Sequence, residues 1–185
     1  MRRAGLLLMA LGLAFLTAAG CLSIRIQAEE TRAGAAGARA LAVMERALSA
    51  PEEAEAMIDE QVWLGRLTIP VLELELPVFS QWSYENLKTA PCRCCGSAED
   101  GDLVLLAHNY RTHFGPIRRL KPGDSVVFED MAGTLYPYQV TAVEIVDADA
   151  LEAVTSGAHD LTLITCTYGG KNRVAVYCDA AAESP

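Results

Sequence analysis

Basic residues are scarce in this chain. Its 185 residues include 15 Lys and Arg against 24 Asp and Glu, which gives a formal net charge of −9. A nucleic-acid-binding protein needs a basic face to neutralise phosphates, so the composition argues against that class of partner. Internal repeats and low-complexity segments are also lacking. With 51% hydrophobic and 21% charged residues, the chain has material for one packed domain and one apolar segment outside it.

That apolar segment lies at the N-terminus, where residues 4–24 carry no charge. A helix that rises about 1.5 Å per residue crosses the hydrocarbon core of a bilayer, about 30 Å thick, over such a length. Arg2 and Arg3 precede the segment and predict that its start faces the cytoplasm. We therefore expect a single-pass protein of the cell membrane, with everything after about residue 25 extracellular.

Two alternatives for this segment depend on the small residues at 17–21, which are typical of signal-peptidase sites. Cleavage there would release the domain, or would leave Cys21 as a lipidated N-terminus. A lipoprotein signal has an aliphatic residue where this chain has Ala18, so we favour a retained anchor. All three cases place the domain outside the cytoplasmic membrane.

The chain divides into three parts: a membrane anchor or signal segment at 1–25, a helical stalk or linker at 26–61, and a domain at 62–185. The 26–61 part is rich in Ala and Glu and could also lie on the domain as a helix. In the domain, strands are predicted at 62–69, 72–79, 103–107, 125–130, 134–146, 161–167 and 173–178, and short helices at 84–88 and 149–155. This spacing predicts an all-β fold, a closed or nearly closed antiparallel β-barrel of about seven to eight strands.

A cysteine ends one of these strands and an arginine opens the next. Cys166 closes the strand at 161–167, and Arg173 follows after the turn at Gly169 and Gly170. Antiparallel pairing across that turn would set the guanidinium beside the thiol. His108 follows the strand at 103–107 and could act as the base that a cysteine nucleophile requires. These residues predict a cationic thiol site, although a buried cysteine on an apolar strand is more often an inert packing residue.

The other cysteines leave several possibilities open. Cys92, Cys94 and Cys95 are too close together for a common zinc spacing, and a fourth ligand would have to be Cys178 or a distant histidine. They could form a disulfide, as is usual in exported chains, or remain free thiols in a reducing habitat.

Potential cations also cluster within one stretch, at Arg111, His113, Arg118, Arg119 and Lys121. They could meet an anionic partner, although a solvated loop is the more common explanation for such a run. We expect the side chains of His113 and His159 to be solvated.

Several motifs resemble those of the sortases, the membrane-anchored cysteine transpeptidases of Gram-positive bacteria. TLITC at 162–166 resembles the TLxTC signature of the family, and RVAV at 173–176 resembles the strand that carries its arginine. The similarity continues upstream in IPVL and PV within 69–78, AHN at 107–109, FGPI at 114–117 and LKPGD at 120–124. It covers residues 62–178, and the run CTYGG at 166–170 is most similar to class B-like sortases.

The resemblance implies a reaction and a set of roles. Sortases cleave an LPxTG-like sorting signal on secreted proteins and transfer the acyl group to an amine of peptidoglycan precursor or of a pilin. By this resemblance Cys166 is the nucleophile, His108 the general acid and base, and Arg173 the group that holds the substrate carbonyl or oxyanion. Thr165 and Asn109 would support the site. The family reaction needs no cofactor, and since we find no compact acidic loop, no calcium or other metal is expected.

Three other classes use similar residues. A Cys-His peptidase or amidase acting on cell-wall peptides would transfer the acyl group to water, but the common amidase order places Cys before His. An L,D-transpeptidase would have an arginine directly after its cysteine motif, where this chain has Thr167 and Tyr168. A non-catalytic surface module would hold Cys166, His108 and Arg173 apart.

Overall fold

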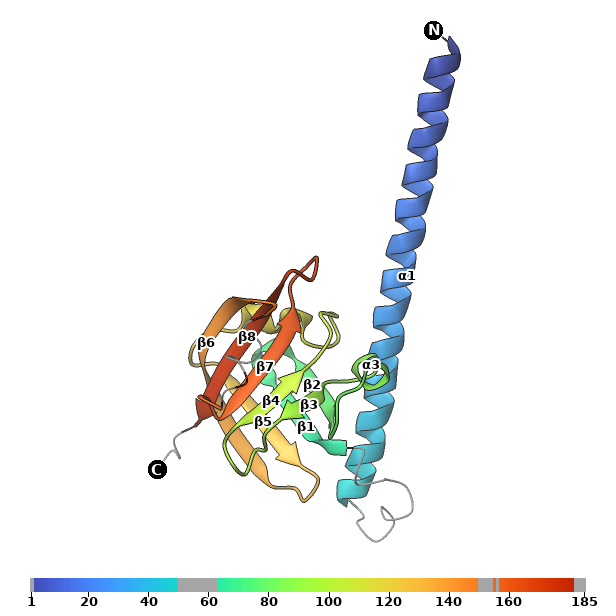
Figure 1. Cartoon of the computed structure of the whole chain (residues 1–185). Coiled ribbons are helices and arrows are strands. Elements are labelled where there is room, and N and C mark those ends of the chain that lie inside the picture. The colour runs from blue at the N-terminus through green and yellow to red at the C-terminus, as the bar shows by residue number, and fades with distance from the viewer. Residues whose placement is uncertain (1, 50–62, 150–154, 156, 182–185) are drawn as a thin grey trace.

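The structure, a computed structural model, describes residues 2–49, 63–149, 155 and 157–181. It consists of a long N-terminal helix and a β-barrel that lies against the C-terminal half of this helix (Figure 1). The helix, α1, spans Arg2–Ser49 without interruption. The boundaries that we predicted within and after this helix, at residues 25 and 61, remain predictions, and residues 50–61 lie outside the described part of the chain.

Eight strands close into a barrel in the order β1-β2-β3-β4-β7-β8-β6-β5. They are β1 Trp63–Ile69, β2 Leu74–Phe79, β3 Cys92–Cys95, β4 Leu103–Leu106, β5 Ser125–Asp130, β6 Leu135–Asp147, β7 Leu161–Cys166 and β8 Asn172–Ala180. The short helices are η1 Pro70–Leu72, α3 Tyr84–Leu87 and η2 Gly115–Arg119. The predicted closed β-barrel with short helices is confirmed, including the helix expected at 84–88. The helix expected at 149–155 lies largely outside the described residues.

The predicted antiparallel arrangement is wrong at two pairings. β2 and β3 are parallel, and so are β4 and β7. A parallel pair needs a connection that carries the chain back along the barrel, and residues 80–91 with α3 provide one between β2 and β3. β3 itself was not predicted, because four residues rich in cysteine give no alternating pattern.

Alternation along the strands separates the barrel core from its outer face. Leu103 and Leu105 of β4, and Leu161 and Leu163 of β7, are fully buried in the main core. The residues between them point outward, as expected for a period of two. On that face a second, smaller cluster buries Val104, Ile164 and Ala175, with Cys94, Leu106, Val146 and Tyr177 packed around it. The sheet formed by β4, β7 and β8 is therefore apolar on both sides.

The C-terminal half of α1 is a docked helix. Ala33 and Met44 are only 3% and 1% exposed, and a Cβ on Gly34 would stand 2.9 Å from Cγ2 of Thr112. Small residues on this helix face thus allow close approach to the barrel loops. Of our two expectations for this part of the chain, a free stalk or a helix lying on the domain, the structure shows the second for these residues.

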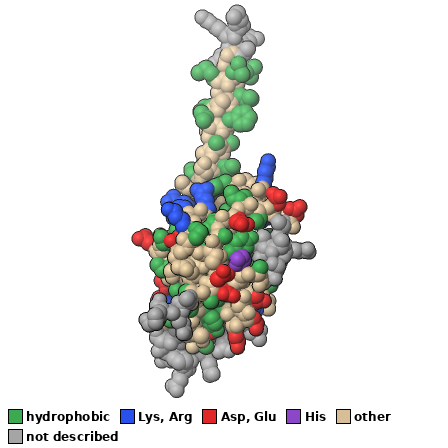
Figure 2. Space-filling model, turned by 90° about the vertical axis from the view of Figure 1, so that its left-hand side faces the viewer, with side chains coloured by type: hydrophobic (Ala, Val, Ile, Leu, Met, Phe, Trp, Pro, Cys, Tyr) green, Lys and Arg blue, Asp and Glu red, His purple; other side chains and the backbone are tan. Residues whose placement is uncertain are grey.

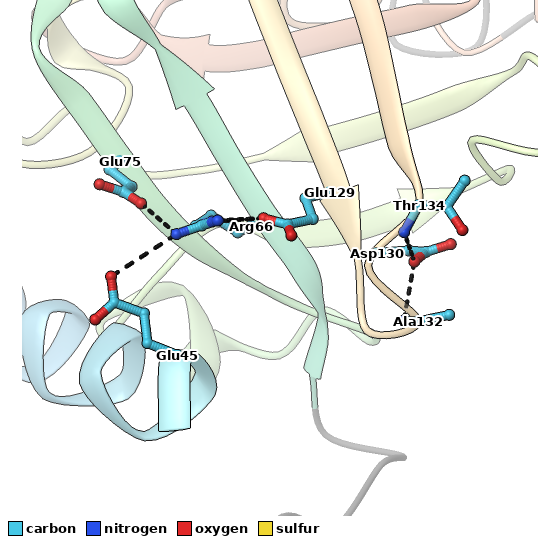
Figure 3. Close-up of polar contacts among 7 residues, drawn as sticks. All are labelled: Glu45, Arg66, Glu75, Glu129, Asp130, Ala132 and Thr134. Carbon is cyan, nitrogen blue, oxygen red and sulfur yellow. Dashed lines mark hydrogen bonds and ion pairs between the residues drawn. The ribbon is translucent and has the colours of Figure 1, made fainter. Parts of the chain in front are cut away.

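An ion-pair network fixes the lower end of the same interface (Figure 3). Arg66 of β1 donates from Nη1 to Glu75 at 2.7 Å and from Nε to Glu129 at 2.9 Å. Its Nη1 also lies 3.7 Å from a carboxylate oxygen of Glu45 on α1. Arg66 therefore connects the helix to two barrel strands.

The N-terminal half of α1 projects away from the barrel, and Figure 2 shows hydrophobic side chains along it. Among the described residues one helix is long and apolar enough to cross a membrane; it covers Leu7–Arg46, with a mean hydropathy of 2.2 in its most apolar part. Leu7, Phe15 and Ile24 are each more than half exposed, at 70%, 71% and 67%. Such a surface is compatible with a single-pass membrane anchor.

Candidate active site

Cys166 and Arg173 are direct neighbours on adjacent strands. β7 and β8 pair antiparallel, and Cys166 and Arg173 form the last matched pair of that ladder. The connecting turn contains Gly169 and Gly170 with φ of +88° and +71°, a region that L side chains rarely adopt. The turn chemistry therefore fixes the register that the sequence predicted for these two residues.

His108 reaches the site through the parallel pair β4 and β7. Leu106 of β4 is matched with Ile164 of β7, and two further residues along each chain lead to His108 and Cys166. The backbone supports this continuation, because Ala107 N donates to Ile164 O at 3.1 Å. In addition, the Thr165 hydroxyl donates to Ala107 O at 2.8 Å. Three strands thus bring His108, Cys166 and Arg173 to one end of the barrel.

A cavity of about 450 Å³ opens beside Cys166 at the mouth of the barrel. Its lining combines the end of β7 with β6 and the connection between β4 and β5. The lining residues are Asn109, Gly115, Arg118, Val143, Glu144, Ile145, Thr165, Cys166, Thr167, Tyr168 and Val174. Thr165 and Asn109, which we had predicted as supporting residues, therefore both border this cavity.

No sequence pattern indicated the β6 residues that line the cavity. Val143, Glu144 and Ile145 reach the mouth because β6 pairs with β8, with Ile145 matched to Val174. No role at the site was predicted for Tyr168 from the sequence, although its place two residues after Cys166 indicates a lining role. Its ring is 71% exposed and lies under the guanidinium of Arg118, whose Cζ is 4.9 Å from the ring centroid.

The His108 imidazole is half-buried against an aromatic ring. The ring centroids of His108 and Tyr110 are 4.9 Å apart. Burial lowers the pKa of His108, the nearby Lys88 ammonium lowers it further, and the Glu29 carboxylate of α1 partly offsets both effects. The neutral imidazole is therefore favoured, which is the form that can accept a proton.

His113 is not solvated, and this prediction was wrong. The connection after β4 folds inward, so the His113 side chain is 1% exposed and its Nε2 lies 3.1 Å from Thr89 O. Its ring centroid lies 5.3 Å from that of Tyr110. Burial lowers the pKa of His113 to about 4, so the residue is a neutral support under Tyr110.

His159 is not simply solvated either. Its Nδ1 lies 2.9 Å from Asp179 Oδ1, and its side chain is 31% exposed. The residue precedes β7 and therefore lies at the end of the barrel opposite to Cys166.

The Arg173 guanidinium is held by its own turn. Its Nη1 donates to Gly170 O at 3.0 Å and to Asn172 O at 3.1 Å. The charge is therefore next to Cys166 in register, and both of these bonds come from the same nitrogen, Nη1.

All six cysteines are free thiols in the structure. Burial raises the pKa of Cys92 to about 11 and, with a smaller effect of Asp179, that of Cys178 to about 12. Burial and the adjacent Cys95 raise the pKa of Cys94 to about 11. These three groups stay protonated near neutral pH, the inert form of a thiol. Within the described residues, no group of three or more His, Cys, Asp or Glu is arranged to hold a metal ion.

Comparison with known proteins agrees with this geometry. The chain is 34% identical over 121 residues to sortase A of Bacillus anthracis, an alignment that covers 62% of this chain and 57% of that protein. The chain thus spans little more than half the length of this relative.

Solved structures share the fold. Sortase C1 of Streptococcus agalactiae is 26% identical with a TM-score of 0.58, over 69% of this chain and 72% of that one. Sortase C of Clostridium perfringens, solved with the C-terminal cell wall sorting motif, is 21% identical with a TM-score of 0.58, over 77% and 87%. These names include classes A and C, so class B-like remains a prediction. The family model described as the sortase domain matches residues 67–181, and the chain belongs to the sortase family.

Proposed function

We propose that this chain is a cysteine transpeptidase that cleaves an LPxTG-like sorting signal and transfers the acyl group to an amine. The observation that carries the proposal is the pairing of β7, the strand that ends at Cys166. β7 pairs parallel with β4, which leads to His108, and antiparallel with β8, which carries Arg173. A nucleophile, a base and a fixed cation on three neighbouring strands are the groups that acyl transfer requires.

In the first half of the reaction, the Cys166 sulfur attacks the carbonyl carbon of the Thr in the sorting signal. The carbonyl oxygen gains charge, and the Arg173 guanidinium donates to it. The C–N bond then breaks, and His108 protonates the leaving amine. A thioester on Cys166 remains. The proton that His108 gives to the amine is the one that the Cys166 thiol loses as its sulfur attacks.

In the second half, an amine replaces the C-terminal piece. The amine nitrogen attacks the thioester carbon, His108 takes the proton that the nitrogen loses, and the C–S bond breaks to return the Cys166 thiol. The acceptor is an amine of peptidoglycan precursor or of a pilin. The substrate is a secreted protein with the sorting signal, the class of motif with which the Clostridium perfringens structure was solved.

The proposed location of the protein rests on α1. We propose that its apolar N-terminal half crosses the cytoplasmic membrane once and that the barrel faces outward. This placement puts the thiol on the side where secreted proteins and cell-wall precursors meet.

The test uses the full chain in detergent with peptides carrying LPxTG-like motifs and a set of candidate amines, read by mass spectrometry. We expect masses in which the peptide, cut after Thr, is joined to the amine. Cys166→Ala should abolish both cleavage and ligation while the barrel stays folded, because loss of one small side chain costs only about 1 kcal/mol. Cleavage without any ligated product would instead support the peptidase alternative, and full activity of Cys166→Ala would exclude the proposal.

A further inference from the structure

The barrel begins directly below the apolar part of α1. Apolar side chains on the helix are exposed as far as Ile26, which is 50% exposed. Glu30 already contacts the barrel, through its Oε1 at 3.3 Å from Arg111 N and its backbone oxygen at 3.4 Å from the Thr112 hydroxyl. Four helical residues rise only about 6 Å. Since α1 is one continuous helix here, the connection between its apolar part and the barrel is rigid.

The end of the barrel that carries Cys166 faces the same way as the projecting helix. In Figure 1 the turn between β7 and β8 and the connection after β4 extend toward the N-terminal side of α1, and the turn between β5 and β6 lies at the opposite end. If α1 crosses a membrane, the Cys166 end is therefore the part of the barrel that comes nearest to the lipid.

The side chains at this end suit an anionic interface. The exposed cations of its loops are Arg111, Arg118, Arg119, Lys121 and Lys171. Figure 2 shows Lys and Arg side chains gathered where α1 leaves the barrel. Acidic groups are present too. Asp147 and Asp149 lie at the end of β6, Asp124 is bonded to Lys121 N, Glu144 lines the cavity, and Glu30 of α1 contacts Arg111 N. The described loops and strand ends here thus carry five exposed cations against four acidic groups, whereas the whole chain has a net charge of −9.

An aromatic side chain stands at the tip of the same surface. Tyr168, in the turn after β7, is 71% exposed and has the Arg118 guanidinium over its ring. Tyrosine beside arginine is typical of the layer where headgroups meet the hydrocarbon, because each presents an apolar body and a polar end. Solvation alone gives no reason for this aromatic ring at the tip.

We propose that the Cys166 end of the barrel rests on the anionic phospholipid headgroups of the membrane that α1 crosses. The proposal rests on the membrane location proposed above and adds a second attachment, made by the β7–β8 turn and the loop cations at 111–121. It selects the anionic-partner explanation for this basic cluster. The thiol would then work within a few residues of the headgroup layer, since Cys166 is two residues from Tyr168 and extended chain spans about 3.3 Å per residue.

An acidic protein partner would also attract these cations, but two observations favour lipid. The rigid helix brings this end to the membrane whether or not a protein partner is present. The partly apolar tip, with Tyr168 beside Arg118, also matches the headgroup layer. Each cation near an anionic leaflet should strengthen the contact about fivefold.

The test is hydrogen–deuterium exchange on the full chain in lipid nanodiscs, made either with phosphatidylcholine alone or with added phosphatidylglycerol. We expect exchange at 167–172 and 115–121 to slow several-fold when phosphatidylglycerol is present, and exchange at 131–135, in the β5–β6 turn, to stay unchanged. Arg119→Gln combined with Lys171→Gln should remove most of this protection. The matched control, Ala132→Glu with Leu135→Glu, changes the net charge by the same amount at the far end and should keep the protection.

Equal exchange at 167–172 in both kinds of nanodisc would overturn the proposal. Protection that persists in the double Gln variant would also overturn it, and so would failure of the chain to insert into nanodiscs. Reduced turnover of a soluble sorting-signal peptide by the double Gln variant in detergent, without lipid, would overturn it in favour of a protein partner. The exchange experiment is run in parallel on Cys166→Ala. Because that variant cannot form a thioester, its protection reports on docking alone, and a failure of the proposed transpeptidation would be seen separately.

Discussion

The Thr165 hydroxyl links the two strands that carry the candidate base and nucleophile. It is buried, and it donates to Ala107 O, the carbonyl immediately before His108. Thr165→Val keeps the shape but leaves that carbonyl without its donor, a loss of about 1 to 3 kcal/mol in the free energy of unfolding. We also expect a fall in kcat, since the backbone before His108 is then free to shift.

The matched control is Thr141→Val, because the Thr141 hydroxyl also donates to a strand carbonyl, Tyr177 O at 3.1 Å, but in an exposed position. Urea unfolding and steady-state kinetics on both variants separate the effects. If kcat falls equally in the two variants, Thr165 has no special role in positioning His108.

Arg173 offers a test of geometry as distinct from charge. A guanidinium donates two oriented hydrogen bonds, while an ammonium gives charge without the planar fork. Arg173→Lys should therefore lose about 2 to 4 kcal/mol of transition-state stabilisation in kcat/KM, the range for one oxyanion donor, with little change in Tm.

Arg119→Lys, in exposed η2, is the control and should retain near full activity with a soluble peptide. The bonds from Arg173 to Gly170 O and Asn172 O add a second expectation. Since the turn loses donors too, exchange of its amides should rise in Arg173→Lys. Wild-type kcat/KM in this variant would exclude Arg173 as an oxyanion donor.

His113 links the fold to pH. In the folded chain its pKa is lowered to about 4 by burial, whereas an unfolded chain has the usual value near 6.5. Below pH 6.5 the His113 ring therefore binds a proton in the unfolded state but not in the folded state. The free energy of unfolding falls as the pH decreases toward 4. The loss should be about 3 kcal/mol across this window.

Denaturant unfolding at several values between pH 7 and pH 4 measures this loss. His113→Gln should be less stable at pH 7 but should show a flatter dependence in the same window. If His113→Gln shows the same dependence of the free energy of unfolding on pH as the wild type, other groups cause that dependence.

At the scale of elements, local sequence patterns predicted neighbouring strands well but did not predict pairings between strands distant in the chain. The Cys166 and Arg173 pair could be read from seven residues of sequence, because a Gly-Gly turn fixes the register of a hairpin. The approach of His108 depends on β4 pairing parallel with β7, strands separated by two others along the chain. No local pattern encodes such a pairing. The strand pattern marked His108 only as a possible base, and the family resemblance joined it to Cys166.

The same limit explains the missed features. β3 is short, and its place in the barrel depends on its neighbours β2 and β4. The burial of His113 depends on how the connection after β4 folds against Thr89, and polar residues in a connection give no sign of it. The roles assigned to His108, Cys166 and Arg173 stay predictions until the variants are measured.

The docked half of α1 provides a prediction for one element. Met44, on the docked half of α1, is 1% exposed, so Met44→Ala should cost about 2 to 5 kcal/mol, the usual range for a large-to-small change in a core. The loss should appear as faster amide exchange over residues 30–46, with the barrel strands unaffected.

Arg46→Ala, on the exposed side of the last helical turn, should leave this exchange unchanged. Equal exchange in the two variants would mean that α1 does not dock on the barrel in solution. The same contact suggests that a chain starting near residue 55 loses part of its stability, since the surface that Ala33 and Met44 cover would then meet water.

For the whole molecule, α1 is one continuous helix from the apolar segment to the barrel. If α1 crosses the membrane as proposed, its length sets the height of Cys166 above the lipid. Seven helix-forming residues inserted between Ile26 and Gln27 add nearly two turns, lift the barrel about 10 Å and rotate it by only about 20°. Because Ala33 and Met44 lie beyond the insertion, helix docking is preserved. We expect turnover of a membrane-anchored sorting-signal substrate to fall several-fold, since its reactive bond would no longer meet Cys166 at the same height.

The same seven residues placed before Ala4 lengthen the other end of the rod and leave the height of the barrel unchanged, so this variant should behave as wild type. Turnover of a soluble peptide should be equal in all three proteins, because the barrel itself is not altered. The measurement is product formation in vesicles with anchored substrate, compared with soluble peptide in the same vesicles. If the insertion at 26 lowers both rates, it has damaged the barrel. If it lowers neither rate, the height of Cys166 is not set by α1, and a flexible connection would serve this protein as well as a continuous helix.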